Sequence, residues 1–243
     1  MTRQSIGMPS GSAELKERIR ALRFRFLIPD DEELSDSRRE RRDLSEAGSA
    51  LLDLVAKDMP PSPSMLAARG GISLWHGSTA SDGSRRRLAL VEAADLFERA
   101  QAQGVNDITV RLAHGQSLVR LAALSEATKY EDFRLRLDLL TRARTLFRSV
   151  LDEGPAGKLL AFVVVSLSDA DASIAGDAAS LTFYELGKGD ENSAAEFAWR
   201  GIVAAHEEAD LLDKYGEVAA VKARRSGAKY AFCLLYTSDA ADE

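Results

Sequence analysis

The most regular apolar pattern in the chain occurs twice between residues 87 and 155. In each copy a small residue and a phenylalanine lie four positions apart. A small or branched residue follows three positions later, and a valine or proline comes five positions after that. Positions i, i+4 and i+7 share one face of an α-helix, so each copy predicts a helix that packs closely against a neighbour. The copies are Ala93, Phe97, Ala100 and Val105 and, fifty residues on, Ala143, Phe147, Val150 and Pro155.

Apolar residues recur at helical spacing along most of the chain, and no stretch shows the period of two that is typical of a strand. The sequence therefore predicts an all-α fold, in which antiparallel helix pairs stack as a short superhelix or form an irregular helical bundle. The first expected helix, residues 13–27, carries an apolar stripe of Leu15, Ile19, Leu22 and Phe26. The other expected helices are residues 44–57, 84–103, 107–127, 132–153, 156–186, 193–212 and 214–232.

Glycine, proline and serine mark the boundaries of these helices. Residues 1–11 are polar and are expected to be disordered, and residues 12–58 are expected to form an N-terminal helical pair. Residues 59–84 are interpreted as a linker and loop with room for a short turn of helix at residues 65–69, because they begin with a proline-rich stretch and residues 70–84 are rich in glycine and serine. This loop leaves no helix to pair with the one that follows it. Residues 85–232 form the expected helical-repeat domain.

The last eleven residues differ in character from the rest of the chain. Residues 233–243, CLLYTSDAADE, resemble the translation of an adapter used in transposase-based sequencing libraries. They continue no helical periodicity, so they are interpreted as a non-native tail and left out of the fold reasoning. The natural sequence is then read only to Phe232 and is expected to continue beyond it. The tail carries three acids and no base, so without it the formal charge changes from −6 to −3.

Composition indicates a soluble globular protein and limits its partners. Apolar residues make up 45% of the chain and charged residues 29%, both ordinary values for this class. The mildly acidic charge argues against a nucleic-acid partner, since nucleic-acid-binding surfaces are basic. The longest apolar run, Leu159 to Val165, is seven residues, whereas a membrane-spanning helix needs about 20. With no signal-peptide pattern at the N-terminus, the sequence predicts a cytoplasmic protein without a membrane partner. The oligomeric state is left open.

Few residues suit catalysis or metal binding. The one cysteine, Cys233, lies in the tail, and the three histidines are His76, His114 and His206. His206 opens the run His-Glu-Glu-Ala-Asp, which resembles half of a zinc-protease helix, but Asp210 stands where the second histidine ligand belongs. A solvated acidic helix face explains this run better. No nucleophile stands beside a base, so the sequence predicts a protein that is not an enzyme and holds no metal and no cofactor.

A cluster of arginines and a set of aromatic residues could also suggest binding sites, but each has a simpler structural interpretation. Arg85, Arg86 and Arg87 form a basic cluster at the start of an expected helix, where the helix dipole disfavours cations. A solvated loop end is the favoured interpretation, and a phosphate or acidic segment of a partner is the alternative. The aromatic residues at helical spacing, Phe197 and Trp199 among them, are expected in the core.

The repeated pattern resembles tetratricopeptide repeats, which are stacked helix pairs that bind peptides or partner proteins. In that family the second helix of each pair carries a small residue, an aromatic, a small residue and a proline. Both copies follow that order, with Val105 in the proline place and Val150 in a small place as departures. Gly115 and Leu118 match the glycine and aromatic places of the next first helix, and the resemblance covers residues 85–170. The spacing of fifty exceeds the family period of about 34 residues, so a helix bundle of other ancestry is the alternative.

The resemblance implies a non-enzymatic scaffold that holds a protein or peptide partner in a groove along the first helices of the pairs. Arg120 is the most specific implied contact, because its planar guanidinium can donate two hydrogen bonds to one carboxylate. Two alternatives stay open: a regulatory or sensor segment of a larger multidomain protein and, least favoured, a self-contained enzyme. The implied partner-binding residues are Thr109, Leu112, Gln116, Val119 and Arg120 on one helix, and Leu159, Phe162, Ser166 and Asp169 on another.

Overall fold

The structure is a computed structural model, and it describes residues 46, 48–50, 53, 62–125 and 127–225. Between residues 62 and 225 the described chain folds into six α-helices and forms no strand, so the predicted all-α class is confirmed. The expected disordered segment, most of the N-terminal helical pair and the C-terminal tail lie outside the described residues. The helices are α3 (Pro63–Thr79), α4 (Gly83–Ala102), α5 (Ile108–Ala123), α6 (Tyr130–Leu151), α7 (Gly157–Lys188) and α8 (Glu191–Arg225).

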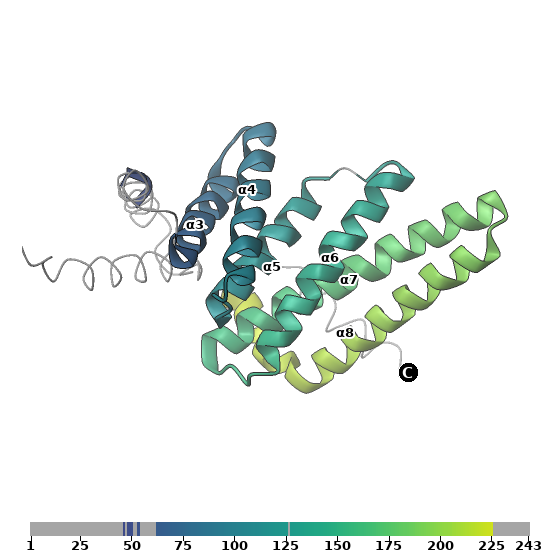
Figure 1. The fold of residues 1–243 in the computed structure, drawn as a ribbon. Helices are drawn as coiled ribbons and strands as arrows, with labels where there is room; N and C mark the ends of the chain where they lie inside the picture. Colours follow the sequence, from purple (N-terminus) through teal and green to yellow (C-terminus); the bar gives the residue numbers. More distant parts are fainter. Residues whose placement is uncertain (1–45, 47, 51–52, 54–61, 126, 226–243) are drawn as a thin grey trace, which may run out of the picture.

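Each helix packs antiparallel against the next one in the chain, which gives three successive pairs, α3–α4, α5–α6 and α7–α8 (Figure 1). The second helix of one pair packs against the first helix of the next. The first helices also touch one another in order, α3 against α5 and α5 against α7, whereas the backbones of α4, α6 and α8 do not approach one another closely within the described residues. The first helices therefore form an inner layer and the second helices an outer layer.

The expected linker and loop is wrong for residues 63–79, which form helix α3. Ser62 caps this helix by accepting a hydrogen bond from the Met65 backbone N–H at 3.3 Å, and Pro63 occupies the first turn, where no N–H is needed. The glycines of α3 favoured a loop in the sequence, because each costs about 1 kcal/mol in a helix relative to alanine. Packing offsets this cost, since Gly70 and Gly77 let α3 approach α4 closely.

The two phenylalanines of the repeated pattern occupy corresponding places in the first two pairs. Phe97 on α4 and Phe147 on α6 are both fully buried. Phe97 lies against Gly70 of α3, where an added Cβ would meet its ring at 2.9 Å, and Phe147 lies against Gly115 of α5, where the distance would be 2.5 Å. The expectation that each phenylalanine lies in a close helix–helix contact is confirmed.

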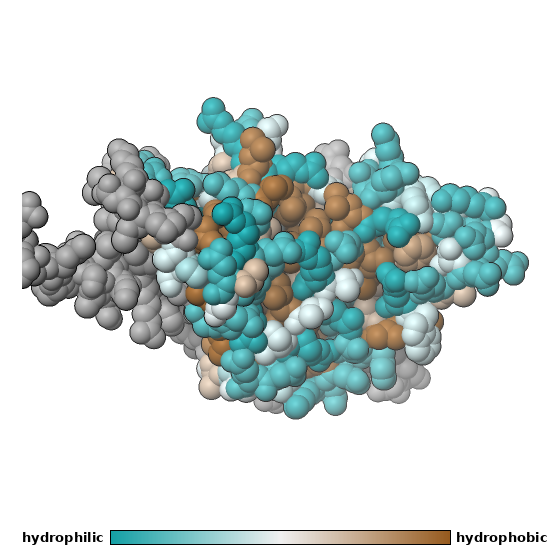
Figure 2. Space-filling view, viewed as in Figure 1, coloured by the Kyte–Doolittle hydropathy of each residue, from teal (hydrophilic) through white to brown (hydrophobic). Residues whose placement is uncertain are grey.

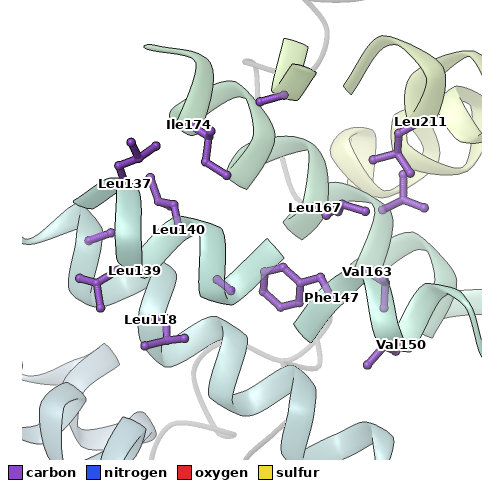
Figure 3. Close-up of a cluster of buried hydrophobic side chains, with 14 of the residues drawn as sticks. Leu118, Leu137, Leu139, Leu140, Phe147, Val150, Val163, Leu167, Ile174 and Leu211 are labelled. Atoms are coloured by element: carbon purple, nitrogen blue, oxygen red, sulfur yellow. The ribbon is translucent and has the colours of Figure 1, made fainter. Parts of the chain in front are cut away.

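The buried apolar side chains form two clusters that share α5. One cluster joins α3, α4 and the first half of α5 around Phe97, with Val110 and Ala113 as its buried members from α5. The larger cluster joins α5, α6, α7 and α8, and Figure 3 shows Phe147 between α6 and α7 with Val163 and Leu167 beside it. Because α5 contributes to both clusters, the three pairs pack as one continuous body.

The last pair is longer and more regular than the sequence indicates. Residues 193–212 and 214–232 were expected as two helices, whereas α8 is one continuous helix from Glu191 to Arg225. The turn before it ends α7 with Gly189 in the left-handed conformation at φ 80°, which favours glycine. Asp190 then caps α8, because its carboxylate accepts a hydrogen bond from the Ser193 backbone N–H at 3.0 Å.

Candidate functional site

The implied partner-binding residues lie on the inner layer, and two of them bind each other. Gln116 of α5 donates a hydrogen bond from Nε2 to Oγ of Ser166 on α7 at 2.8 Å. Ser166 is buried and Gln116 is half-buried. This bond joins the first helices of the second and third pairs, so both side chains contribute to the packing of the inner layer.

Several of the other implied residues also pack inside the protein. Leu112 is 1% exposed and belongs to the larger core cluster, so it does not lie on a surface that a partner can contact. Val119, Leu159 and Phe162 are partly buried and pack against the same cluster. Helical spacing placed these residues on the correct helices. Their burial depends on contacts between helices, which the spacing within one helix does not describe.

The remaining implied residues are at least partly accessible. The Thr109 hydroxyl donates a hydrogen bond to the Asp107 carboxylate at the start of α5, which ties it to the helix cap. Asp169 is exposed on α7. Arg120 is half-buried in the last turn of α5. Arg120 is thus a charged residue that is partly removed from water.

Arg120 lies in a cationic corner formed with Arg86 and Arg87 of α4. Burial, and then the positive charge of Arg86, lowers the pKa of Arg120 below its ordinary value. Arg86 donates a hydrogen bond from Nε to the Gly77 carbonyl at 3.4 Å, and Arg87 donates one to the Ser125 hydroxyl at 3.2 Å. Within the described residues, the Arg120 side chain makes no hydrogen bond or ion pair. We call Arg86, Arg87 and Arg120 the arginine corner.

An arginine that the sequence did not single out joins the two helices of the second pair. Arg111 of α5 is buried and donates hydrogen bonds to the Ser149 hydroxyl at 3.1 Å and the Ser149 carbonyl at 3.3 Å, and it also pairs with Glu153. These contacts supply hydrogen-bond donors to the Ser149 carbonyl and hydroxyl near the C-terminal end of α6. A lone arginine among apolar neighbours was the signal for this role, because a buried cation needs a partner.

A network of buried ion pairs holds α7 between its neighbours. Arg144 and Arg136 of α6 pair with Asp171 and Asp177 of α7 at 2.7 and 3.2 Å. Burial raises the pKa of Asp171 to about 6, against the opposing charges of Arg144 and Arg148. Burial also raises the pKa of Asp177, against the charge of Arg136. The partners lie on different helices, so sequence spacing could not reveal them.

The acidic run on α8 belongs to the same network. Glu207 accepts hydrogen bonds from Arg144 and Arg148 of α6, the latter at 2.6 Å. Burial opposes ionisation of Glu207, but these hydrogen bonds lower its pKa overall. Glu208 accepts a hydrogen bond from the Ser168 hydroxyl at 2.9 Å. The run therefore joins helices, and no cluster of His, Cys, Asp and Glu that could hold a metal occurs in the described part of the chain.

His114 is also structural. Burial, followed by the positive charge of Arg142, lowers the pKa of His114 to about 4, so the imidazole is neutral at pH 7. Its Nδ1 lies 2.7 Å from Oε1 of Gln101, and its ring stacks on that of Phe97 with centroids 6.4 Å apart and an angle of 30° between the ring planes. The hydrogen bond assigns the proton to Nδ1, because a glutamine carbonyl oxygen can only accept.

The concave features of the described surface offer little for chemistry. A half-open depression of about 430 Å³ lies between the end of α6 and α8, with Arg148, Asp152, Asp210 and Lys214 among its lining residues. Its charged groups are held in helix surfaces and do not form a nucleophile–base pair. A buried apolar pocket with converging polar groups, the usual form of a small-molecule site, does not match this depression.

Helix α7 has one property that the sequence analysis did not weigh. From Leu159 to Lys188 it is long and apolar enough to cross a membrane, the one such helix in the described chain. Length and composition alone carry this observation, and core helices of soluble proteins share it. Here α7 packs between α6 and α8 and carries three buried carboxylates, Asp171, Asp177 and Glu185. Its apolar character serves the core of the last two pairs.

Large apolar side chains are exposed in two places. Figure 2 shows hydrophobic groups gathered over α4, α5 and α6. On α4 and α6 the large apolar residues Leu88, Val91 and Leu135 are exposed. The second place is the α7–α8 hairpin, whose far half extends beyond α6 (Figure 1). There Trp199 is 66% exposed, so the expectation that it lies in the core is wrong, whereas Phe197 is buried as expected.

Comparisons with protein-family models, with curated proteins and with solved structures find no match to this chain. Its function is therefore argued from the arrangement of its own residues.

Proposed function

We propose that this chain is a non-enzymatic helical-repeat scaffold that holds an acidic segment of a partner protein at the arginine corner. The fold supports the proposal through its three successive helix pairs and its inner layer of first helices. The contacts of Phe97 with Gly70 and of Phe147 with Gly115 support it further, since they fit the small and aromatic places of tetratricopeptide repeats.

The observation that carries the proposal is the half-buried guanidinium of Arg120 beside the like charge of Arg86. Removing a cation from water costs several kcal/mol unless a counter-charge and hydrogen bonds compensate it. Within the described residues no carboxylate compensates Arg120. A partner carboxylate would accept two hydrogen bonds from its planar guanidinium and relieve the repulsion from Arg86.

The proposal is tested with the full chain, because α3 supplies the Gly77 carbonyl that positions Arg86. A partner recovered by affinity capture is identified, and its affinity is measured for the unaltered chain and for Arg120→Glu. We expect at least tenfold weaker binding, equivalent to about 1.4 kcal/mol, because the substitution places a negative charge at a partly desolvated contact.

Arg134→Glu is the matched control, since it makes the same charge change on an exposed residue of α6. Thermal unfolding followed by circular dichroism verifies that both variants fold. Equal affinities for the two variants, with the fold intact, would remove the arginine corner from the proposal. An Arg120→Lys variant separates charge from geometry, because lysine keeps the charge but lacks the fork of donors.

A further inference from the structure

The α7–α8 hairpin presents an apolar face on which no other described helix packs. On α7 the exposed stripe includes Ala172, Gly176, Ala179 and Phe183, and Phe183 is 74% exposed. On α8 the exposed stripe includes Trp199 at 66% and Ile202 at 61%. The backbone of α8 approaches only α7 closely among the described helices, and Glu207 adds ion pairs to α6, so the side of α8 that carries Trp199 and Ile202 is open. We call this surface the hairpin face.

Such a face indicates a binding surface, because soluble monomers rarely expose contiguous large apolar side chains. Gly176 and Gly187 are helical glycines at which an added Cβ would meet no other atom within 4 Å, so nothing in the described structure requires their small size. Along the α7 stripe, the small residues Ala172, Gly176 and Ala179 leave room for a second helix to approach closely.

The chain itself contains a segment whose apolar positions match those of this face. Residues 13–27 are expected to form a helix, and their apolar residues Leu15, Ile19, Leu22 and Phe26 lie at spacings of four, three and four. The α7 stripe from Ala172 to Phe183 has the same spacings. Helices whose apolar positions share this period pack along their lengths, with large side chains set into spaces left by small ones.

Charge favours the hairpin face over the other exposed apolar surface. Residues 13–27 carry five basic and two acidic side chains. Between residues 169 and 213 the exposed carboxylates outnumber the exposed Lys and Arg side chains by six to two. On the other surface, Leu88 follows Arg87 and Leu135 follows Arg134, and both arginines are exposed. A basic helix is therefore attracted more strongly to the hairpin face, because exposed acidic and basic side chains are equal in number on α4 and α6.

The connection is long enough. The 34 residues from 28 to 61 join the segment to the start of α3, and an extended chain of that length spans roughly 110 Å. Helix α8, with 35 residues, is only about 50 Å long. A segment tethered in this way has a high effective concentration at the hairpin face, so a modest apolar contact is sufficient for docking.

We infer that residues 13–27 dock as an amphipathic helix on the hairpin face of the same chain, with Leu15, Ile19, Leu22 and Phe26 against α7 and α8. This contact covers Trp199 and shields the apolar face of the last helix pair, α7–α8, from water. It is independent of the arginine corner, so either proposal can fail without the other.

The first test measures the accessibility of Trp199 in the full chain. Trp75→Phe leaves Trp199 as the only tryptophan, because the chain has two. In this background we expect Leu22→Glu to raise acrylamide quenching severalfold and to shift the emission to longer wavelength. Ala21→Glu is the matched control, since position 21 lies away from the apolar stripe, and we expect it to change neither quantity. Unchanged quenching in Leu22→Glu overturns the inference.

A disulfide trap distinguishes the possible occupants. In a Cys233→Ser background, Ile19→Cys combined with Gly176→Cys is expected to form an intramolecular disulfide under mild oxidation. Ala21→Cys combined with Gly176→Cys is the control and is expected to form it much more slowly. Exclusively intermolecular disulfides, together with a dimer in sedimentation equilibrium, would assign the hairpin face to a second copy and overturn docking within one chain. Equal rates for the two pairs would overturn docking in this orientation of the segment.

Discussion

The ring of Phe147 occupies the space that any side chain at position 115 would need. A Cβ built on Gly115 would lie 2.5 Å from Cε1 of Phe147, closer than Cβ atoms come to other heavy atoms in folded proteins. Gly115 is in the middle of α5 and Phe147 is in the last part of α6. The pair therefore sets the distance between the two helices, and Gly70 with Phe97 does the same for α3 and α4.

Gly115→Ala is expected to destabilise the protein in spite of the better helix propensity of alanine. Overpacking a well-packed core costs about 1–3 kcal/mol, whereas replacing a helical glycine gains at most about 1 kcal/mol. The free energy of unfolding, measured by urea denaturation, should therefore fall. Gly187→Ala is the control, because an added Cβ there meets no atom within 4 Å. If both variants are more stable than the unaltered chain, the Phe147 ring does not occupy the space beside position 115.

Phe147→Ala and Phe97→Ala are each expected to lower the free energy of unfolding by about 3–5 kcal/mol. Both rings are fully buried, so each truncation removes apolar contacts and leaves a cavity beside a glycine that cannot fill it. Leu88→Ala, at a residue that is 71% exposed, is the control and should cost no more than about 0.5 kcal/mol. Costs near the control value for both buried positions would contradict the packing described for the two pairs.

Gln116 and Ser166 are expected to be coupled in stability. The hydrogen bond between them at 2.8 Å joins α5 to α7 in a partly buried position. A double-mutant cycle with Gln116→Ala and Ser166→Ala should give a coupling free energy of about 0.5–1.5 kcal/mol. Additive effects of the two substitutions would show that the bond is not maintained in solution.

Asp171 is expected to make stability depend on pH between about 4 and about 6. Burial raises its pKa from 3.8 to about 6, so in this range the folded state binds more protons than the unfolded state. The free energy of unfolding then decreases as the pH rises, because ionisation is more costly in the folded protein. The contribution of Asp171 is therefore greatest at low pH and is lost as the pH rises through about 6.

The measurement compares the unaltered chain with Asp171→Asn by urea unfolding at pH 4, 5, 6 and 7 and constant ionic strength. Asparagine cannot ionise, so the difference between the two proteins isolates Asp171 from Glu207, whose lowered pKa acts in the opposite direction. We expect the stability of the unaltered chain relative to the variant to decrease steadily from pH 4 to pH 7. A constant difference would mean that Arg144 holds Asp171 ionised throughout.

Helical spacing by itself determined the class of fold and part of the packing. Residues at i, i+4 and i+7 must share one side of a helix, so the pattern around Phe97 and Phe147 located two buried seams correctly. It also located Phe197 in the core. What the spacing could not supply was the neighbour on that side, or whether a second side of the same helix was covered as well.

Tertiary structure decided the features that depend on such neighbours. Helix α3 forms across glycines that favour a loop, because α4 packs closely against Gly70 and Gly77. Leu112 and Ser166 were expected on a groove surface and are buried, because α5 and α7 lie side by side. Trp199 was expected in the core and is exposed, because no described helix packs on the outer side of α8. In each case the deciding contact comes from a residue distant in sequence, and periodicity within one helix carries no information about it.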